Sequence, residues 1–180
     1  MPATPQDVIH FWREAGPARW FGKDARFDDA IRLRFEPVHH AAARGEYAAW
    51  GETAEGALAL LILLDQFPRN LWRGSAHAFA TDPMARAIAH KAVRRGFDQQ
   101  VEEALRLFFY LPFEHAEDVQ EQALSMELFA TLGDPEYLKY AKLHQDIIVR
   151  FGRFPHRNAC LGRETTPVEQ AFLDDGGFAG

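Results

Sequence analysis

The fold of this chain follows from ALALLILLDQFPRN, the stretch at residues 57–70. Eight apolar residues in a row lead into Asp65 and Gln66, then into a Phe-Pro pair, and finally into Arg69 and Asn70. The run is much shorter than the ~20 residues of a membrane-spanning helix, and its Leu- and Ala-rich composition favours a buried helix over a strand. The polar residues that follow it therefore lie in or near the interior, where each needs a hydrogen-bonding partner.

A second stretch, FGRFPHRN at residues 151–158, has a similar ending and also follows an apolar helical pattern. We call LDQFPRN (residues 64–70) the first Phe-Pro motif and FPHRN (residues 154–158) the second Phe-Pro motif. Polar side chains placed after apolar helices in this way are the best indication of a site in the sequence.

Composition restricts the class of protein. The chain has 180 residues, enough for one domain with a substantial core, and 47% of them are hydrophobic and 26% charged. A net charge of −6 argues against a nucleic-acid partner, and the single cysteine, Cys160, suits a reducing compartment. The first residues lack the pattern of a signal peptide, and no run is long enough to span a membrane. We expect a soluble cytoplasmic protein that binds neither nucleic acid nor membrane.

Helix-start signals recur along the chain. Four pairs place a capping side chain before a proline at the first helical position: Thr4-Pro5, Asp82-Pro83, Asp134-Pro135 and Thr166-Pro167. Apolar residues follow them at spacings of three and four, whereas no stretch alternates with period two. The pattern predicts a single all-α domain over residues 1–180, with about seven to nine helices and a loose tail at residues 174–180. Pro37 is expected to kink or break its helix, and Pro68 to end regular helix near Gln66.

The first Phe-Pro motif has two interpretations. Asp65 and Arg69 are four residues apart, so a buried carboxylate can orient the guanidinium to bind a carboxylate or phosphate. Alternatively the motif is a structural network, in which Asp65 pairs with Arg69 while Asn70 satisfies carbonyls that Pro68 leaves without a donor.

The second Phe-Pro motif concentrates hydrogen-bond donors in an acidic protein. His156, Arg157 and Asn158 stand near Arg153 and Arg163, which is the local charge reversal expected of an anion pocket. The alternative is that these side chains cap helix C-termini, where cations are favourable.

An acidic cluster, EHAED, begins at Glu114 and His115. It contains neither an HExxH pair nor an ExxH motif, so it is interpreted as the solvated first turn of the next helix rather than as a metal site. His115 remains a candidate general base, and His144, on an apolar helix face, is expected to be a hydrogen-bonded core residue. We predict no metal site and no cofactor, and the sequence identifies no catalytic residue.

Four stretches together resemble the bacterial family called domain of unknown function 924. They are ARWFGKD (residues 18–24), LLDQFPRNLWRGSAHAFATDPMA (63–85), FFYLPFEHAED (108–118) and FGRFPHRNACLGRETTPVEQAFL (151–173). Ala116 departs from the His-Ser-Glu-Asp pattern of the family. The resemblance implies an all-helical, tetratricopeptide-like array, and it brings no activity, substrate or catalytic residue.

The sequence therefore supports two hypotheses about function. The first is a helical-repeat-like module that binds a peptide or protein partner. The alternative is a small-molecule-binding protein or enzyme whose anion-recognising pocket is built from the two Phe-Pro motifs. Its candidate ligand-binding residues are Asp65, Arg69, Asn70, Glu114, His115, His156, Arg157 and Asn158.

Overall fold

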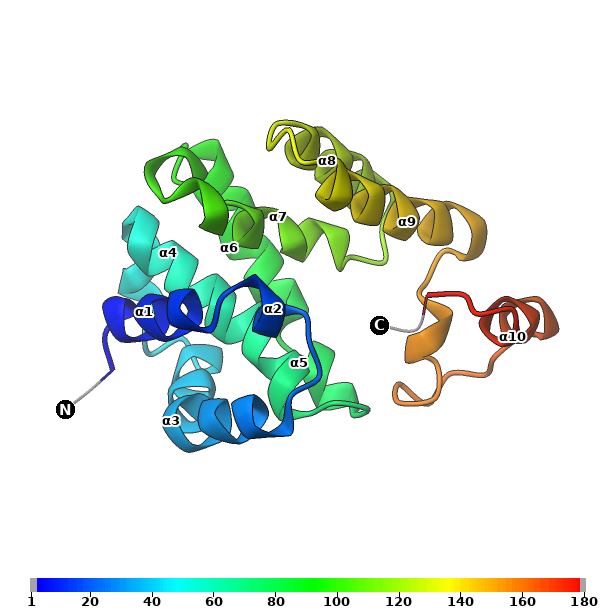
Figure 1. The fold of residues 1–180 in the computed structure, drawn as a ribbon, viewed down its shortest axis with the longest axis horizontal. Coiled ribbons are helices and arrows are strands. Elements are labelled where there is room, and N and C mark those ends of the chain that lie inside the picture. Colours follow the sequence, from blue (N-terminus) through cyan, green and yellow to red (C-terminus); the bar gives the residue numbers. More distant parts are fainter. Residues whose placement is uncertain (1–2, 179–180) are drawn as a thin grey trace. The chain divides into compact units, whose positions relative to one another are not determined.

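The computed structural model describes residues 3–178, and within them every regular element is helical, so the predicted all-α fold is confirmed (Figure 1). Eight α-helices in this range have eight or more residues, in agreement with the expected seven to nine: α1 (Pro5–Ala15), α3 (Ala25–Ala43), α4 (Ala54–Leu61), α6 (Asp82–Arg94), α7 (Leu107–Glu114), α8 (Val119–Ala130), α9 (Pro135–Phe151) and α10 (Pro167–Asp174).

Shorter elements connect these helices. They are the α-helical segments α2 (Pro17–Trp20) and α5 (Phe67–Leu71), the π-helical turn η2 (Ile62–Gln66), and the 3-10 turns η1 (Ala48–Glu52), η3 (Ala76–Phe79), η4 (Asp98–Gln100), η5 (Glu103–Leu105) and η6 (Pro155–Arg157).

The chain forms two compact units. Among the described residues, the first unit comprises 3–73 and 77–112, and the second comprises 74–76 and 113–178. Helix α7 begins in the first unit and ends in the second. That residues 1–180 fold as a single domain stays a prediction.

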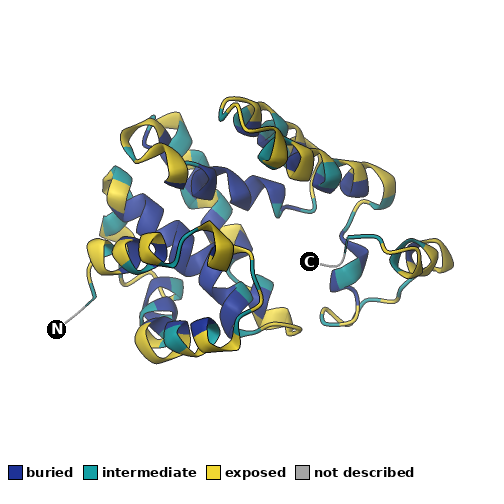
Figure 2. Cartoon of the chain, viewed as in Figure 1, coloured by how far each residue is buried: buried dark blue, intermediate teal, exposed yellow. Residues whose placement is uncertain are grey.

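The first unit is built around α4, as its apolar run predicts. Residues from Ala57 to Leu64 are at most 3% exposed, and Figure 2 shows this stretch among the buried parts of the chain. Helices α1 and α6 pack against α4, while α3 packs against η2 and α5. Aromatic rings fill the space between these elements, with Trp12 5.5 Å from Phe67 and 5.6 Å from Phe108. Burial on this scale is the main stabilising term for the unit.

The second unit contains a helical hairpin and a smaller C-terminal helix. Helices α8 and α9 pack against each other, and α10 packs against η6. Ile147, Ile148 and Phe154 form a buried core on which Phe151 and Phe172 also pack. Helix α10 starts after Thr166, as the sequence predicts, and Thr166 and Glu169 form a capping box by exchanging side chain–backbone hydrogen bonds.

Pro37 does not break its helix, so this expectation is wrong. Helix α3 continues through Pro37 for 19 residues. The proline has no N–H for the carbonyl of Leu33, but both residues lie on the exposed side of the helix, where water can satisfy that carbonyl.

The predicted loose tail is partly packed. The N–H of Gly177 donates to the carbonyl of Phe172 at 2.9 Å, and the Phe178 ring lies 4.6 Å from that of His144. Residues 179 and 180 of the tail lie outside the described range. Within that range no helix has both the length and the apolar character needed to cross a bilayer.

Candidate functional site

Pro68 was expected to end regular helix near Gln66, but the helical path continues through it. Helix α4 ends at Leu61, η2 makes one π-helical turn, and α5 continues through Pro68. In η2 the N–H of Phe67 donates to the carbonyl of Ile62 rather than to that of Leu63, which an α-helix would use. Because Pro68 has no N–H, it cannot replace the missing donor.

Side chains from elsewhere in the first unit complete this turn. His39 Nδ1 lies 2.8 Å from the carbonyl oxygen of Leu63, and the hydroxyl of Thr81 donates to the carbonyl of Leu64 at 2.5 Å. The carbonyls near Pro68 are therefore satisfied by His39 and Thr81. The sequence-based prediction that Asn70 satisfies these carbonyls is wrong. The amide of Asn70 donates to α3 instead.

Arg69 is held by two carboxylates. Its Nη1 and Nη2 donate to the two carboxylate oxygens of Asp82, both at 2.9 Å, and Nη1 also donates to the carbonyl of Asp65 at 2.6 Å. The Asp65 carboxylate is 3.4 Å from the same nitrogen. Burial disfavours the charged guanidinium, but Asp65 and Asp82 outweigh it and keep the pKa of Arg69 above its usual range. This geometry favours the structural interpretation of the motif.

Asn70 extends the network to α3. Its amide donates to Asp28 at 2.8 Å, and Arg73 donates to both oxygens of the same carboxylate at 2.7 and 3.0 Å. The polar residues at the end of the buried helix thus have partners within the first unit. A ligand-binding role for Asp65, Arg69 and Asn70 stays a prediction.

Asn158, in the second unit, belongs to an ion-pair network around Glu169. The Asn158 amide is 3.3 Å from Glu169 Oε2 and its oxygen accepts from Arg163 at 3.0 Å. Arg153 donates to both Glu169 oxygens at 2.6 and 2.8 Å, and this guanidinium is the main cause that lowers the pKa of Glu169 to about 2. Arg163 also forms a bidentate pair with Glu117 at 2.6 and 2.9 Å. These contacts connect α10 to the segment that follows α9.

The other second-unit candidates gather around His144, which the sequence predicted as a hydrogen-bonded core histidine. Its Nδ1 is 2.8 Å from the carbonyl of Tyr140 and 3.5 Å from Glu114 Oε1, and its ring is 6.4 Å from that of His115. Arg157 donates to the carbonyl of His115 at 3.1 Å. We call Glu114, His115, His144, His156 and Arg157 the His144 cluster.

The His144 cluster combines basic side chains with one carboxylate. Burial is the main cause that lowers the pKa of His144 to about 3, and electrostatic interaction with His115, Arg157 and His156 adds to this effect, so the ring is neutral near pH 7. The Glu114 carboxylate lies 3.5 Å from the same ring. The guanidinium of Arg157 is the group in this cluster that can favour an anion.

Glu114 differs from the expectation of a solvated acidic turn. It lies at the end of α7, and only 5% of its surface is exposed. The turn after it is fixed by the buried amide of Gln122, which donates to the carbonyls of Glu114 and Ala116 at 2.6 and 2.8 Å. Of the remaining acidic residues, Asp118 caps α8 through the N–H groups of residues 120 and 121. Only Asp118 therefore matches the predicted acidic start of the next helix.

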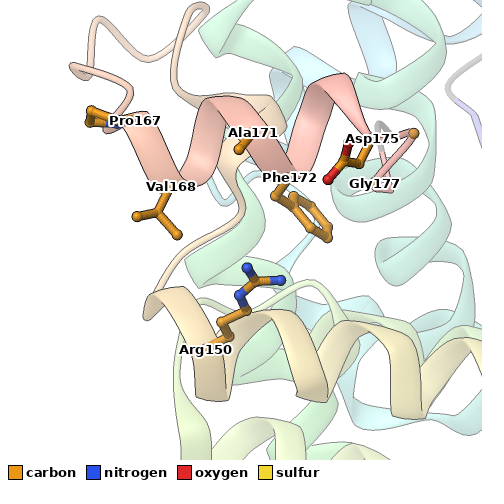
Figure 3. Close-up of a pocket in the computed structure, with 8 residues that line it drawn as sticks. Arg150, Pro167, Val168, Ala171, Phe172, Asp175 and Gly177 are labelled. Carbon is orange, nitrogen blue, oxygen red and sulfur yellow. The ribbon is translucent and has the colours of Figure 1, made fainter.

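An open pocket lies between α9 and α10, at residues that the sequence interpretation did not select (Figure 3). Its volume is about 490 Å³, and we call it the α9–α10 groove. The lining residues are Arg150, Pro167, Val168, Ala171, Phe172, Asp175, Gly176 and Gly177.

Two charged side chains of the groove form no hydrogen bond or ion pair with other described residues. Within residues 3–178, neither the Arg150 guanidinium nor the Asp175 carboxylate forms a hydrogen bond or ion pair. Arg150 lies over the rings of Phe151 and Phe172, at 4.6 and 5.7 Å from their centroids, and Figure 3 shows it pointing from α9 toward Phe172. Val168 is 59% exposed. Apolar surface between two available charges is suited to an amphipathic ligand.

These features define an all-helical protein whose first Phe-Pro motif is internally paired and whose second unit has two candidate binding regions. A model of the family described as "Bacterial protein of unknown function (DUF924)" matches residues 8–177, so the chain belongs to this family. A solved structure of a protein of unknown function from Agrobacterium tumefaciens is 55% identical, covering 96% of this chain and 97% of its own, with a TM-score of 0.93. No curated protein matches the chain significantly.

Proposed function

We propose that this protein is a binding module that holds a peptide segment of a partner protein in the α9–α10 groove. The observation that carries the proposal is the pair of available charges, Arg150 and Asp175, beside the apolar surface of Val168 and Phe172. A volume of about 490 Å³ is within the range of small-ligand and side-chain pockets.

The lining determines the chemistry of the expected peptide. Burial of one large apolar side chain against Val168 and Phe172 contributes about 1.5–3 kcal/mol. Arg150, already stacked on an aromatic ring, presents a planar guanidinium to a carboxylate, and Asp175 attracts a basic group. The preferred segment therefore carries an apolar residue between an acidic residue and a basic residue.

The architecture is compatible with this role. Antiparallel helical hairpins such as α8–α9 are the units from which helical-repeat binding proteins are built, and the tetratricopeptide-like arrangement that the family resemblance implies belongs to the same proposal. A cytoplasmic peptide or protein is the expected partner, in line with the single cysteine of the chain.

The test is a selection from a library of short fluorescent peptides, followed by affinity measurement for the enriched sequences. We compare the wild type with Arg150→Glu and with Lys139→Glu, a matched charge reversal on the same helix at an exposed residue outside the groove. We expect enrichment of sequences with an apolar residue between an acidic and a basic residue, at least about tenfold weaker binding by Arg150→Glu, and unchanged binding by Lys139→Glu. Absence of enrichment, or equal effects of the two reversals, contradicts the proposal.

A second candidate function, binding of a small anion, is favoured by the His144 cluster. His115, His156 and Arg157 surround a neutral buried imidazole, and His115 is within reach of acting as a proton donor or acceptor for a bound group. In this form the pocket uses His156 and Arg157 of the second Phe-Pro motif together with Glu114 and His115, without the first motif.

A thermal-shift screen with carboxylates, phosphates and nucleotides tests this second function. A ligand at 100 times its dissociation constant adds about 2.7 kcal/mol to stability. The second function predicts a shift in the wild type that is lost in a folded Arg157→Ala variant. Flat traces for every compound, with Arg157→Ala melting lower, assign Arg157 to structure alone.

A further inference from the structure

Three histidines of the first unit lie together outside the regions described so far. His39 and His40 are neighbours in α3, and His77 belongs to η3. One ring nitrogen from each lies within 4.8 Å of the others, and the three ring centroids are 5.3, 6.0 and 6.4 Å apart. Three imidazoles converging in this way are a common ligand set for a transition-metal ion.

The distances between the three imidazoles are close to those around a coordinated ion. Tetrahedral zinc with Zn–N bonds of about 2.0–2.1 Å brings ligand nitrogens to about 3.3 Å and imidazole centroids to about 5 Å. The distances between the three rings therefore need to shorten by roughly 1–1.5 Å for the nitrogens to bind one ion. His40 is half-buried and His77 exposed, so both side chains have room to rotate toward the buried His39.

His39 is the best-positioned ligand of the three. It is only 1% exposed, and its Nδ1 is 2.8 Å from the carbonyl of Leu63. A carbonyl can only accept, so Nδ1 carries the hydrogen and Nε2 carries the lone pair of the neutral ring. Nε2 is buried and has no hydrogen-bond partner among the described residues. A buried acceptor without a partner is unfavourable, and a metal ion at Nε2 removes that penalty.

The hydrogen bond to Leu63 is also the usual support for a metal-binding imidazole. Metal-bound histidines generally donate their second ring N–H to a backbone carbonyl or carboxylate, which holds the ring in one orientation. Here the Leu63 carbonyl is available because η2 diverts the N–H of Phe67 and Pro68 supplies none.

Trp72 and Glu36 complete the surroundings. The Trp72 ring stacks on His77 at 4.0 Å with an interplanar angle of 5°, and lies 4.9 and 5.5 Å from the rings of His39 and His40. Glu36 Oε1 is 3.9 Å from His40 Nε2, which adds negative charge beside the cluster. Trp72 is therefore an intrinsic fluorescence reporter for any ion that binds.

We propose that His39, His40 and His77 form a binding site for one divalent first-row transition-metal ion of the zinc type. Three imidazoles supply nitrogen ligands, and the exposed side of His77 leaves the fourth position to water. The site lies wholly in the first unit and does not depend on the α9–α10 groove.

The test is a zinc titration of chelator-treated full-length protein, followed by calorimetry and by Trp fluorescence. The variants are His77→Ala and His40→Ala. His10→Ala is the matched control, because His10 is an exposed histidine of the first unit that faces Glu14. His39 is left intact, since its removal deprives the Leu63 carbonyl of its donor.

We expect one zinc ion per chain and a fluorescence change in the wild type. His77→Ala and His40→Ala each weaken zinc binding at least about tenfold, while His10→Ala leaves it unchanged. Cobalt in place of zinc gives the visible absorption of a tetrahedral site. Absence of stoichiometric binding, unchanged affinity in His77→Ala and His40→Ala, or an equal loss in His10→Ala overturns the proposal.

Discussion

The two Phe-Pro motifs have similar sequences and different structures. In the first, Pro68 lies inside a continuous helical path from α4 through η2 to α5. In the second, Gly152 ends α9 with a left-handed φ of 71°, the backbone becomes extended at Phe154, and Pro155 starts a 3-10 turn. The residues before each motif therefore decide its conformation, because a glycine in the left-handed region ends a helix and a buried apolar run continues it.

The side chains of the two motifs also differ in their partners. Arg69 is occupied by two carboxylates of the first unit, whereas Arg157 contacts a carbonyl and lies 4.4 Å over the Phe154 ring. Asn70 and Asn158 both belong to ion-pair networks. The comparison indicates that the asparagines hold structure in both motifs, while only the second motif places its arginine next to histidines.

The largest expected effect comes from Arg69→Ala. Removal of this guanidinium takes away the cation that Asp65 and Asp82 share in the interior, so we expect a loss of about 3–5 kcal/mol in the free energy of unfolding. Urea denaturation measures it. Arg26→Ala, at an exposed arginine of the first unit, is the control and should change stability by less than about 0.5 kcal/mol. Equal effects of the two substitutions contradict a structural role for the first motif.

A smaller loss is expected from Glu169→Gln in the second unit. The substitution removes the charge-assisted bonds from Arg153 but keeps a side-chain oxygen for the N-cap of α10, so we expect about 1.5–3 kcal/mol. Denaturation followed by a probe in the second unit measures the loss. Glu164→Gln, at an exposed neighbour in sequence, should be neutral, and a neutral Glu169→Gln argues against the network.

The pH dependence of stability gives a related prediction. Glu169 has a pKa of about 2 in the folded protein, against about 4.3 when unfolded. Its contribution is complete above the unfolded pKa and is lost as pH falls toward 2. Between pH 5 and 3, the wild type should therefore lose more stability than Glu169→Gln. Parallel pH profiles of the two proteins are the contrary outcome.

The smallest expected effect on stability comes from Arg150→Ala. Its guanidinium has no hydrogen bond or ion pair to the described residues and contacts only the Phe151 and Phe172 rings, so the free energy of unfolding should change by less than about 1 kcal/mol. Thermal and urea denaturation check this. A large destabilisation means that Arg150 supports the packing of α10 on α9, and that it is not reserved for a ligand.

Local signals in the sequence were sufficient for the helices and the core. The N-caps at Thr4 and Thr166 and the apolar run at residues 57–64 depend on neighbours in sequence, and the structure contains all three. The predicted cap at Asp82 is wrong, because α6 begins at Asp82 itself and the preceding Thr81 side chain makes no capping hydrogen bond. The effect of each proline on its helix depends on what satisfies the carbonyls that lose their N–H donor. Water can do so at Pro37, and side chains distant in sequence do so at Pro68. Such long-range partners are not visible in a single sequence.

The candidate sites show the same limit. The Asp65–Arg69 pair follows from a spacing of four, but the second partner, Asp82, comes from another helix. His39 and His40 are adjacent in sequence, yet nothing there indicates that His77 joins them. The α9–α10 groove was missed because an exposed valine in a capped helix looks like ordinary surface until the helices are packed.

Peptide binding in the α9–α10 groove is tested most directly by a two-dimensional amide NMR titration of the full chain with a peptide enriched in the library selection. We expect chemical-shift changes to concentrate at the groove, around Arg150, Val168 and Phe172, while the amides of the first Phe-Pro motif stay unchanged. Changes centred on residues 64–70 would overturn the proposal, because they would place the ligand at the motif whose charges are already paired.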